Sequence, residues 1–280
     1  MIRFKSVHPV LLLTLLSAAA QSPAAEEKPL WEVGFGVGGV SFPAYRGSDK
    51  VHNFLLPTPY FVYRGDFFKS DRHGIRGNLF ESDRIELNLS LSASPPTESD
   101  DVEVRDGMPD LDSTLEFGPQ LDLTLWRSDN QKRYLKLRMP VRAAFTVEGS
   151  PEHVGWIFSP NLNLDITDLP TLPGWNLGFL AGPIYATDDQ HDYFYSVAPE
   201  YATATRPAYQ ADGGYSGSQF LMSLSKRFDH TWIGAFVRYD TLNGAVFEDS
   251  PLVEKQSFAA AGLAIAWIFG ESRERVWVDE

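Results

Sequence analysis

Two pairs of residues in the chain have the types and spacing that hydrolytic chemistry needs. Asp110 and Asp112 come just before a long alternating segment, and Asp189 and His191 come just after another. A histidine beside a carboxylate can act as a general base that activates water. Aspartate is common in loops, however, and a histidine there is usually only solvated. The pairs define a hydrolase hypothesis that requires them to face each other, and a non-enzymatic chain is the favoured interpretation.

Metal and cofactor chemistry has weak support in the sequence. The chain contains no cysteine, and four histidines lie without the spacing of a metal site, at His52, His73, His153 and His230. The acidic stretch 98–110 could supply oxygen ligands to a divalent cation, but a solvated loop is the simpler explanation. The formal charge of -13 disfavours nucleic acid as a partner, because binding it requires a basic surface. We therefore expect no cofactor and no nucleic acid.

The segment 111–147 alternates strictly between apolar and polar residues and predicts two long strands. From Leu111 to Leu125 the odd positions are mostly leucine and the even positions mostly polar, and the pattern resumes after the turn at 128–131. A period of two places the two sets on opposite faces of a sheet. Long strands with one apolar and one charged face suit a wall between lipid and water. The pattern predicts a transmembrane antiparallel β-barrel.

The rest of the chain predicts an all-β, up-and-down barrel of about 12 strands, with about 10 as the alternative. The number depends on 64–83, where a division at 71–74 gives the larger value. Short and long connections otherwise alternate, which places the short turns in the periplasm and the long loops outside. Segment 54–63 is the least well patterned because it contains Pro57 and Pro59. The expected strands are 31–41, 54–63, 66–70, 74–80, 84–93, 111–126, 133–147, 154–167, 175–187, 216–228, 231–242 and 257–269.

The two ends of the sequence are expected to lie outside the barrel. Residues 1–25 read as a secretory signal peptide, because Arg3 and Lys5 precede a short apolar stretch and an alanine-rich cleavage site. That stretch is too short to span a membrane as a helix, which takes about 20 residues. We expect a cleaved signal peptide over 1–25, an outer-membrane barrel over 26–269 and a C-terminal tail over 270–280. The predicted location is the outer membrane of a Gram-negative bacterium.

The barrel prediction assigns positions to two sets of side chains, the lumen-lining charges and the tryptophans of the aromatic girdles. Charged residues on the polar faces should line the lumen, where opposite charges can pair across the interior and fill the barrel. Tryptophans near strand ends should form aromatic girdles at the membrane interfaces, although Trp126 falls on the polar side of its strand. The lumen candidates are Asp112, Glu116, Asp122, Lys136, Arg138, Arg142, Asp165, Arg238 and Asp240. The girdle candidates are Trp31, Trp126, Trp156, Trp175, Trp232 and Trp267.

Five segments of the chain resemble the MipA/OmpV family of MltA-interacting outer-membrane proteins. They are PAYRGSD at 43–49, YRGDFF at 63–68, MPDLDSTLE at 108–116, the aromatic stretch 193–214 and DSPLV at 249–253. The resemblance implies an outer-membrane barrel without catalytic residues. It also implies a scaffold that joins a murein lytic transglycosylase to a bifunctional murein synthase. The tail over 270–280 departs from the family, which usually ends on an aromatic residue of the last strand.

Three functions remain open from the sequence. The favoured one is an adaptor for murein-remodelling enzymes, with outer-membrane lipid, the lytic transglycosylase and the synthase as partners. The first alternative is a narrow outer-membrane channel for small solutes. The remote alternative is a surface protease of the omptin kind, built on the Asp110–Asp112 and Asp189–His191 pairs. The aromatic loop 188–215 could either plug the lumen or lie exposed outside.

Overall fold

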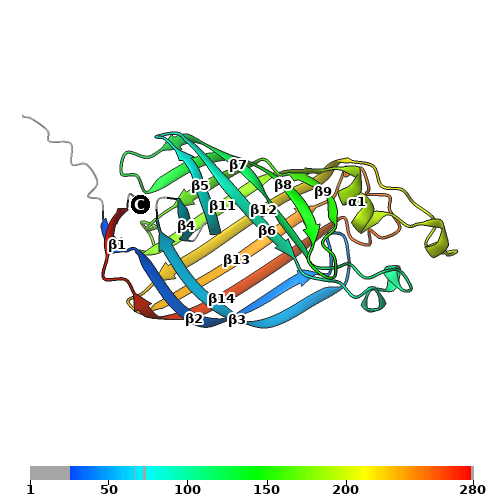
Figure 1. Cartoon of the computed structure of the whole chain (residues 1–280), viewed down its shortest axis with the longest axis horizontal. Helices are drawn as coiled ribbons and strands as arrows, with labels where there is room; N and C mark the ends of the chain where they lie inside the picture. The colour runs from blue at the N-terminus through cyan, green and yellow to red at the C-terminus, as the bar shows by residue number, and fades with distance from the viewer. Residues whose placement is uncertain (1–25, 66, 72–73, 279–280) are drawn as a thin grey trace, which may run out of the picture.

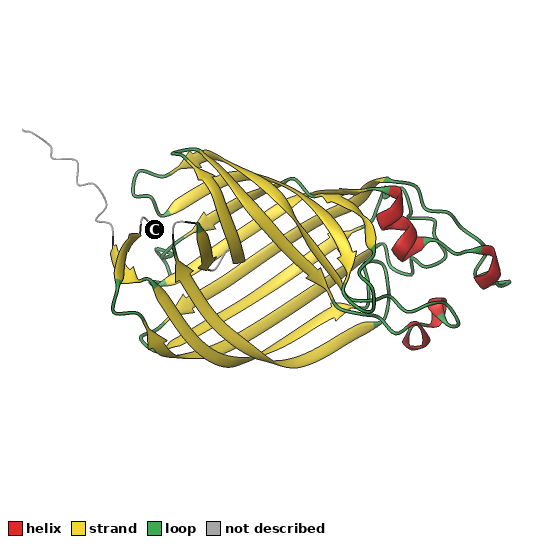
Figure 2. Ribbon diagram, viewed as in Figure 1, coloured by secondary structure: helices red, strands yellow, loops and turns green. Residues whose placement is uncertain are grey.

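The protein is a single closed β-barrel with a group of long loops at one end (Figures 1 and 2). The computed structural model describes residues 26–65, 67–71 and 74–278, so the predicted signal peptide lies outside the described residues. The barrel strands are β2 (Trp31–Pro43), β3 (Val51–Arg64), β4 (Phe68–Asp71), β5 (Gly74–Glu81), β6 (Ile85–Ser94), β7 (Thr114–Arg127), β8 (Arg133–Thr146), β9 (His153–Phe158), β10 (Asn161–Ile166), β11 (Trp175–Ala186), β12 (Gly214–Arg227), β13 (Thr231–Thr241) and β14 (Ser257–Glu271).

Each strand pairs antiparallel with its neighbours in the chain, and β14 pairs with β2 to close the barrel. Strands β9 and β10 both pair with β8 and with β11, so they are two halves of one barrel strand. The break falls at Ser159 and Pro160, where proline has no N–H for the ladder. The wall therefore has 12 strands, which confirms the larger predicted number. No helix among the described residues is long and apolar enough to cross a membrane.

One sector of the wall is incomplete. Strand β4 has four residues and β5 has eight, whereas β2 and β3 have 13 and 14. Strand β3 pairs with β4 only at Tyr63 and Arg64. Figure 1 places the short strands at the end of the barrel that also holds β1 (Glu26–Pro29). This is the segment whose strand count the sequence left open.

Four loops fold together at the opposite end of the barrel. They are 44–50, 95–113, 187–213 and 242–256, and they include helix α1 (Asp188–Tyr195) and three short 3-10 turns. Their buried residues share one apolar cluster centred on Phe247, Tyr195 and Leu242. We call this loop assembly the cap. By the rule that long loops of bacterial barrels lie outside, the cap faces the exterior.

A separate two-stranded sheet lies at the end with the short turns. Strand β1 (Glu26–Pro29) pairs antiparallel with β15 (Arg275–Val278). Leu30 N–H donates to Glu274 O at 2.9 Å and to Ser272 Oγ at 3.0 Å, which fixes this sheet to the barrel rim. Most of the expected C-terminal tail is thus ordered structure on the periplasmic side.

Candidate functional site

The lumen wall between β6 and β10 carries a row of ion pairs. Glu116 pairs with Arg142 at 2.9 Å, and Lys136 pairs with Glu86 at 2.5 Å. Arg138 lies 3.7 Å from both Asp122 and Asp165. The structure therefore brings six of the predicted lumen residues together in one charged row. The pairs join strands along the wall rather than crossing the interior, so they do not fill the barrel in the way we expected.

The remaining lumen candidates lie nearer the cap. Asp240 on β13 is fully buried and accepts from Arg238 at 2.7 Å and from Arg46 of loop 44–50 at 2.9 Å. This pair of contacts ties a cap loop to the lumen wall. Asp112 lies in the loop before β7, and not on a barrel strand. Its pKa is raised by desolvation and by the nearby carboxylate of Glu148.

The tryptophans divide between the two faces of the wall. Trp31, Trp156 and Trp267 are exposed on the outer face, and Trp175 lies on the same face by its register with Lys226. The sequence predicts Trp232 in the girdle, but the structure puts it on the lumen side, with its ring centroid 6.0 Å from that of Tyr60. Paired residues on neighbouring strands direct their side chains to the same face. Trp232 pairs with Arg227, and Arg227 reaches Glu32 inside the barrel, so Trp232 also faces inward.

Trp126 reaches the outer face because of a β-bulge. The register of β7 against β8 shifts between Thr124 and Trp126. One extra residue on a strand reverses the face of every residue beyond it. Trp126 therefore pairs with Leu135 and is half exposed, although simple alternation puts it on the polar side.

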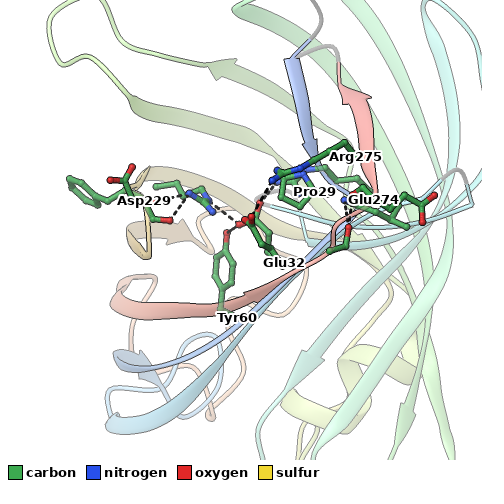
Figure 3. Close-up of polar contacts among 12 residues, drawn as sticks. Pro29, Glu32, Tyr60, Asp229, Glu274 and Arg275 are labelled. Carbon is green, nitrogen blue, oxygen red and sulfur yellow. Dashed lines mark hydrogen bonds and ion pairs between the residues drawn. The ribbon is translucent and has the colours of Figure 1, made fainter.

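A second polar cluster, which the sequence analysis missed, lies at the periplasmic rim (Figure 3). Glu32 is almost fully buried and accepts from Arg64 and Arg227, each at 2.8 Å. Arg64 also donates to Pro29 O at 2.7 Å, which links the cluster to β1. The missed signal was the position of Glu32 two residues before Gly34, on the inward face of β2. This cluster holds the periplasmic sheet against the barrel.

The lumen contains a cavity of about 470 Å³. Its walls come from β2, β3, β8 and β10 to β14. Strands β3, β13 and β14 contribute mainly apolar side chains, whereas β8, β10 and β12 contribute polar ones. A volume of this order lies within the range of about 300–1,000 Å³ that is typical of small-molecule sites. Inward-facing lining residues include Leu56, Thr58, Arg138, Asn163, Asp165, Ser223, Ser225, Trp232, Phe236 and Ala264.

The cap holds His191 in a structural role. Its Nδ1 lies 2.6 Å from Asp212 O and its Nε2 lies 2.5 Å from Ser216 Oγ. Because a carbonyl oxygen only accepts, Nδ1 carries the proton and Nε2 accepts from the serine hydroxyl. The ring packs edge-on against Phe247, with centroids 4.6 Å apart, and the side chain is only 2% exposed. Both ring nitrogens are occupied, so this geometry gives no support to the protease alternative.

The cap is expected to loosen in acid through His191. Burial lowers the pKa of His191 below its usual range. Since the folded form resists protonation, its stabilising contribution is present above about pH 6.5 and is lost as the pH falls toward the lowered pKa. The protection factors of amides in 187–213, which correct for the intrinsic slowing of hydrogen exchange in acid, should fall in that window by up to about tenfold per pH unit, the limit for one linked proton. His191→Gln should remove this pH dependence, and an unchanged profile in the variant would contradict the assignment.

Aromatic loop 188–215 belongs to the cap. Tyr195 stacks on Phe247 with centroids 3.7 Å apart, and its hydroxyl donates to Arg46 O at 2.9 Å. Ser250 Oγ donates to Tyr195 O at 2.6 Å. The loop is thus fixed to two other loops. Among the described residues no group of three or more His, Cys, Asp or Glu side chains could hold a metal ion.

The family model described as MltA-interacting protein MipA matches residues 35–269. The chain belongs to the MipA family. Four of the five segments that carry the resemblance lie wholly or largely in the cap loops, namely 43–49, 108–116, 193–214 and 249–253. Most of the sequence signals for the family thus lie in the cap.

Two curated relatives agree with this assignment. The chain is 25% identical over 230 residues to "Outer membrane protein Omp26La" of Vibrio anguillarum. It is 24% identical over 234 residues to "Outer membrane protein OmpV" of Vibrio cholerae. Each alignment covers 80% of this chain and 81% of the relative. The protein is an outer-membrane β-barrel of a Gram-negative bacterium, and its relatives are named as outer membrane proteins and not as enzymes.

Solved structures show distant likeness to other outer-membrane proteins. A "Bacterial polysaccharide outer membrane secretin" gives a TM-score of 0.40 at 8% identity, covering 85% of this chain and 99% of that one. A FadL homologue from Pseudomonas aeruginosa gives 0.29 at 11% identity, covering 75% and 60%. Both TM-scores are low, so neither structure informs the function.

Proposed function

We propose that this MipA-family barrel is a non-enzymatic adaptor that holds a murein lytic transglycosylase, and through it a bifunctional murein synthase, at the outer membrane. The observation that carries the proposal is the family match over 35–269, because that family is described by its interaction with MltA. The role without chemistry agrees with the relatives, which are named as outer membrane proteins. Murein lies in the periplasm, so the partner must bind the end of the barrel opposite the cap.

The sheet of β1 and β15 offers the contact surface at that end. It projects beyond the barrel rim and is anchored through Leu30 to Ser272 and Glu274. Trp277 on β15 is 68% exposed. Exposed tryptophan is frequent at the energetic centres of protein interfaces. We therefore place the enzyme contact on this sheet and the adjoining short turns.

A photocrosslinking amino acid at position 277 tests the contact in cells. We expect a covalent adduct with a murein lytic transglycosylase, identified by mass spectrometry after purification from outer membranes. The matched control carries the same crosslinker at Val246, which is 40% exposed in the cap on the other side of the membrane. Capture of a murein enzyme at both positions would refute the adaptor function. So would capture at neither position, if a non-specific chemical crosslinker also recovers no murein enzyme.

A narrow solute channel is the second candidate, and the lumen cavity is the observation that favours it. The ion pairs along the wall and the packed cap at the outer end weigh against a steady aqueous path. Single-channel recordings in planar bilayers distinguish the two functions. The adaptor function predicts no steady conductance from the purified barrel, whereas a reproducible unitary current would favour the channel.

A further inference from the structure

The outer half of the barrel wall is open between β3 and β6. Strand β3 pairs with β2 along its whole length, but among the described residues its pairing with β4 is confined to Tyr63 and Arg64. Strand β6 pairs with β5 from Glu86 to Leu89, and beyond Leu89 it pairs with β7 alone among the described residues. Segments 51–62 and 90–94 thus present strand edges toward the same sector of the wall, which the short β4 and β5 do not reach.

The sequence of β3 is suited to an edge. Pro57 and Pro59 lie opposite Val37 and Phe35 in the ladder with β2. Residues two apart direct their backbone groups to the same side of a strand, and proline cannot donate, so both proline nitrogens face away from β2 and toward the opening. Arg64 has the opposite parity, and its N–H donates to Leu30 O on the β2 side. Two donors that would be costly to leave unpaired beside lipid are therefore absent.

The lumen cavity lies against this opening. Leu56 and Thr58 of β3 line it, and the lining continues through β2, β14, β13, β12, β11 and β10 to Arg138 of β8. No described lining residue comes from β4 to β7. The strands that do not line the cavity include the short β4 and β5, so the cavity and the opening meet beside β3. The exposure of Leu56 agrees with an opening beside β3, since this side chain faces the lumen and is still 47% exposed.

The cavity has an apolar wall and a polar wall. Leu56, Phe236 and Ala264 come from strands β3, β13 and β14, whereas Asn163 and Arg138 lie across the lumen. Asn163 is 6% exposed, and its Oδ1 has no hydrogen-bond partner. Arg138 Nε also lacks a hydrogen bond, because its two carboxylate neighbours stand at 3.7 Å. A buried acceptor and a buried donor without partners are costly unless a ligand completes them.

We propose that the cavity binds a single-chain amphiphile that enters from the membrane through the opening between β3 and β6. The hydrocarbon chain lies against Leu56 and Phe236. The polar head reaches Asn163 and Arg138, which supply the unused acceptor and donor. Lateral entry avoids the cap, so the molecule need not cross the packed loops. This site is independent of the periplasmic contact surface.

Photolabelling in lipid nanodiscs tests the site directly. The probe is a lysophosphatidylcholine with a diazirine at the end of its acyl chain, and labelled positions are mapped by mass spectrometry. Bulk lipid should label outward residues such as Leu263. Occupation of the cavity should in addition label inward residues on β3 and β13, including Leu56 and Phe236. Labels confined to outward residues would overturn the proposal.

A pair of neighbouring substitutions controls the experiment. Leu56→Trp fills the cavity from β3, and Leu55→Trp adds the same bulk to the outer face, where Leu55 is 79% exposed. We expect Leu56→Trp to lose the label on Phe236 and Leu55→Trp to keep it. Retained heat-modifiability on gels shows that each variant is folded, and Thr58→Phe replaces Leu56→Trp should that variant fail to fold. Unchanged labelling of Phe236 in the filled variant would also overturn the proposal.

Discussion

Gly36→Ala is expected to abolish most folded protein in the outer membrane. Gly36 faces the lumen on β2, at the seam where β2 pairs with β14. An added Cβ would overlap the carbonyl oxygen of Ile265 and lie 2.6 Å from Ala266 Cα. Both are backbone atoms of a paired strand and cannot rotate away. We expect the free energy of unfolding to fall by about 3 kcal/mol or more, the upper end for overpacked sites, because the clash is relieved only when β2 and β14 move apart.

The amount of heat-modifiable barrel in outer-membrane fractions measures this effect. Gly39→Ala is the matched control, since Gly39 lies on the same strand and a Cβ there would meet its nearest atom, Phe54 O, only at 4.0 Å. The control should assemble normally. Normal assembly of Gly36→Ala would show that β2 and β14 are less closely apposed than the structure places them.

Glu32→Ala is expected to destabilise the barrel by about 3 kcal/mol. Removing one partner of a buried ion pair leaves an uncompensated charge, which typically costs about 3–5 kcal/mol. Arg64 would lose its carboxylate in a buried position, whereas the partly exposed Arg227 would recover some solvation, so the lower end of the range applies. The change should lower the urea midpoint of unfolding in detergent micelles or vesicles.

Glu271→Ala separates this effect from a general loss of negative charge at the rim. Glu271 pairs with Arg275 at 3.1 Å, and both side chains are more than two-fifths exposed. An exposed pair of this kind contributes only about 0–1 kcal/mol. A similar loss of stability in both variants would argue against the buried Glu32 cluster as the anchor of the periplasmic sheet.

Local alternation was sufficient to predict most of the wall. Strands β7 and β8 were predicted within a few residues, because lipid on one face and charges on the other impose a period of two. Trp126 and Trp232 show where this reasoning fails. A β-bulge turns Trp126 to the outer face, and pairing with the inward-facing Arg227 places Trp232 inside the barrel. Neither register shifts nor cross-strand partners are visible in a local pattern.

The polar sites were predicted less completely. Six lumen charges were found in one row because they follow the polar face of adjacent strands. The Glu32 cluster joins β2, β3 and β12, which are distant in sequence, so no local spacing could reveal it. The cap was visible only as a set of long loops, since its core depends on contacts such as Tyr195 with Phe247.

The pairing of β14 with β2, and of β15 with β1, also fixes the order of events during assembly. One edge of β2 pairs with the neighbouring β3, but its other edge meets a partner only when β14 has been delivered, and contacts so distant in sequence form slowly. Until then the edge of β2 is a template for any extended segment. The β14-facing edge of β2 therefore stays exposed until the last strand is in place, and the joining of these two edges is the step that closes the barrel.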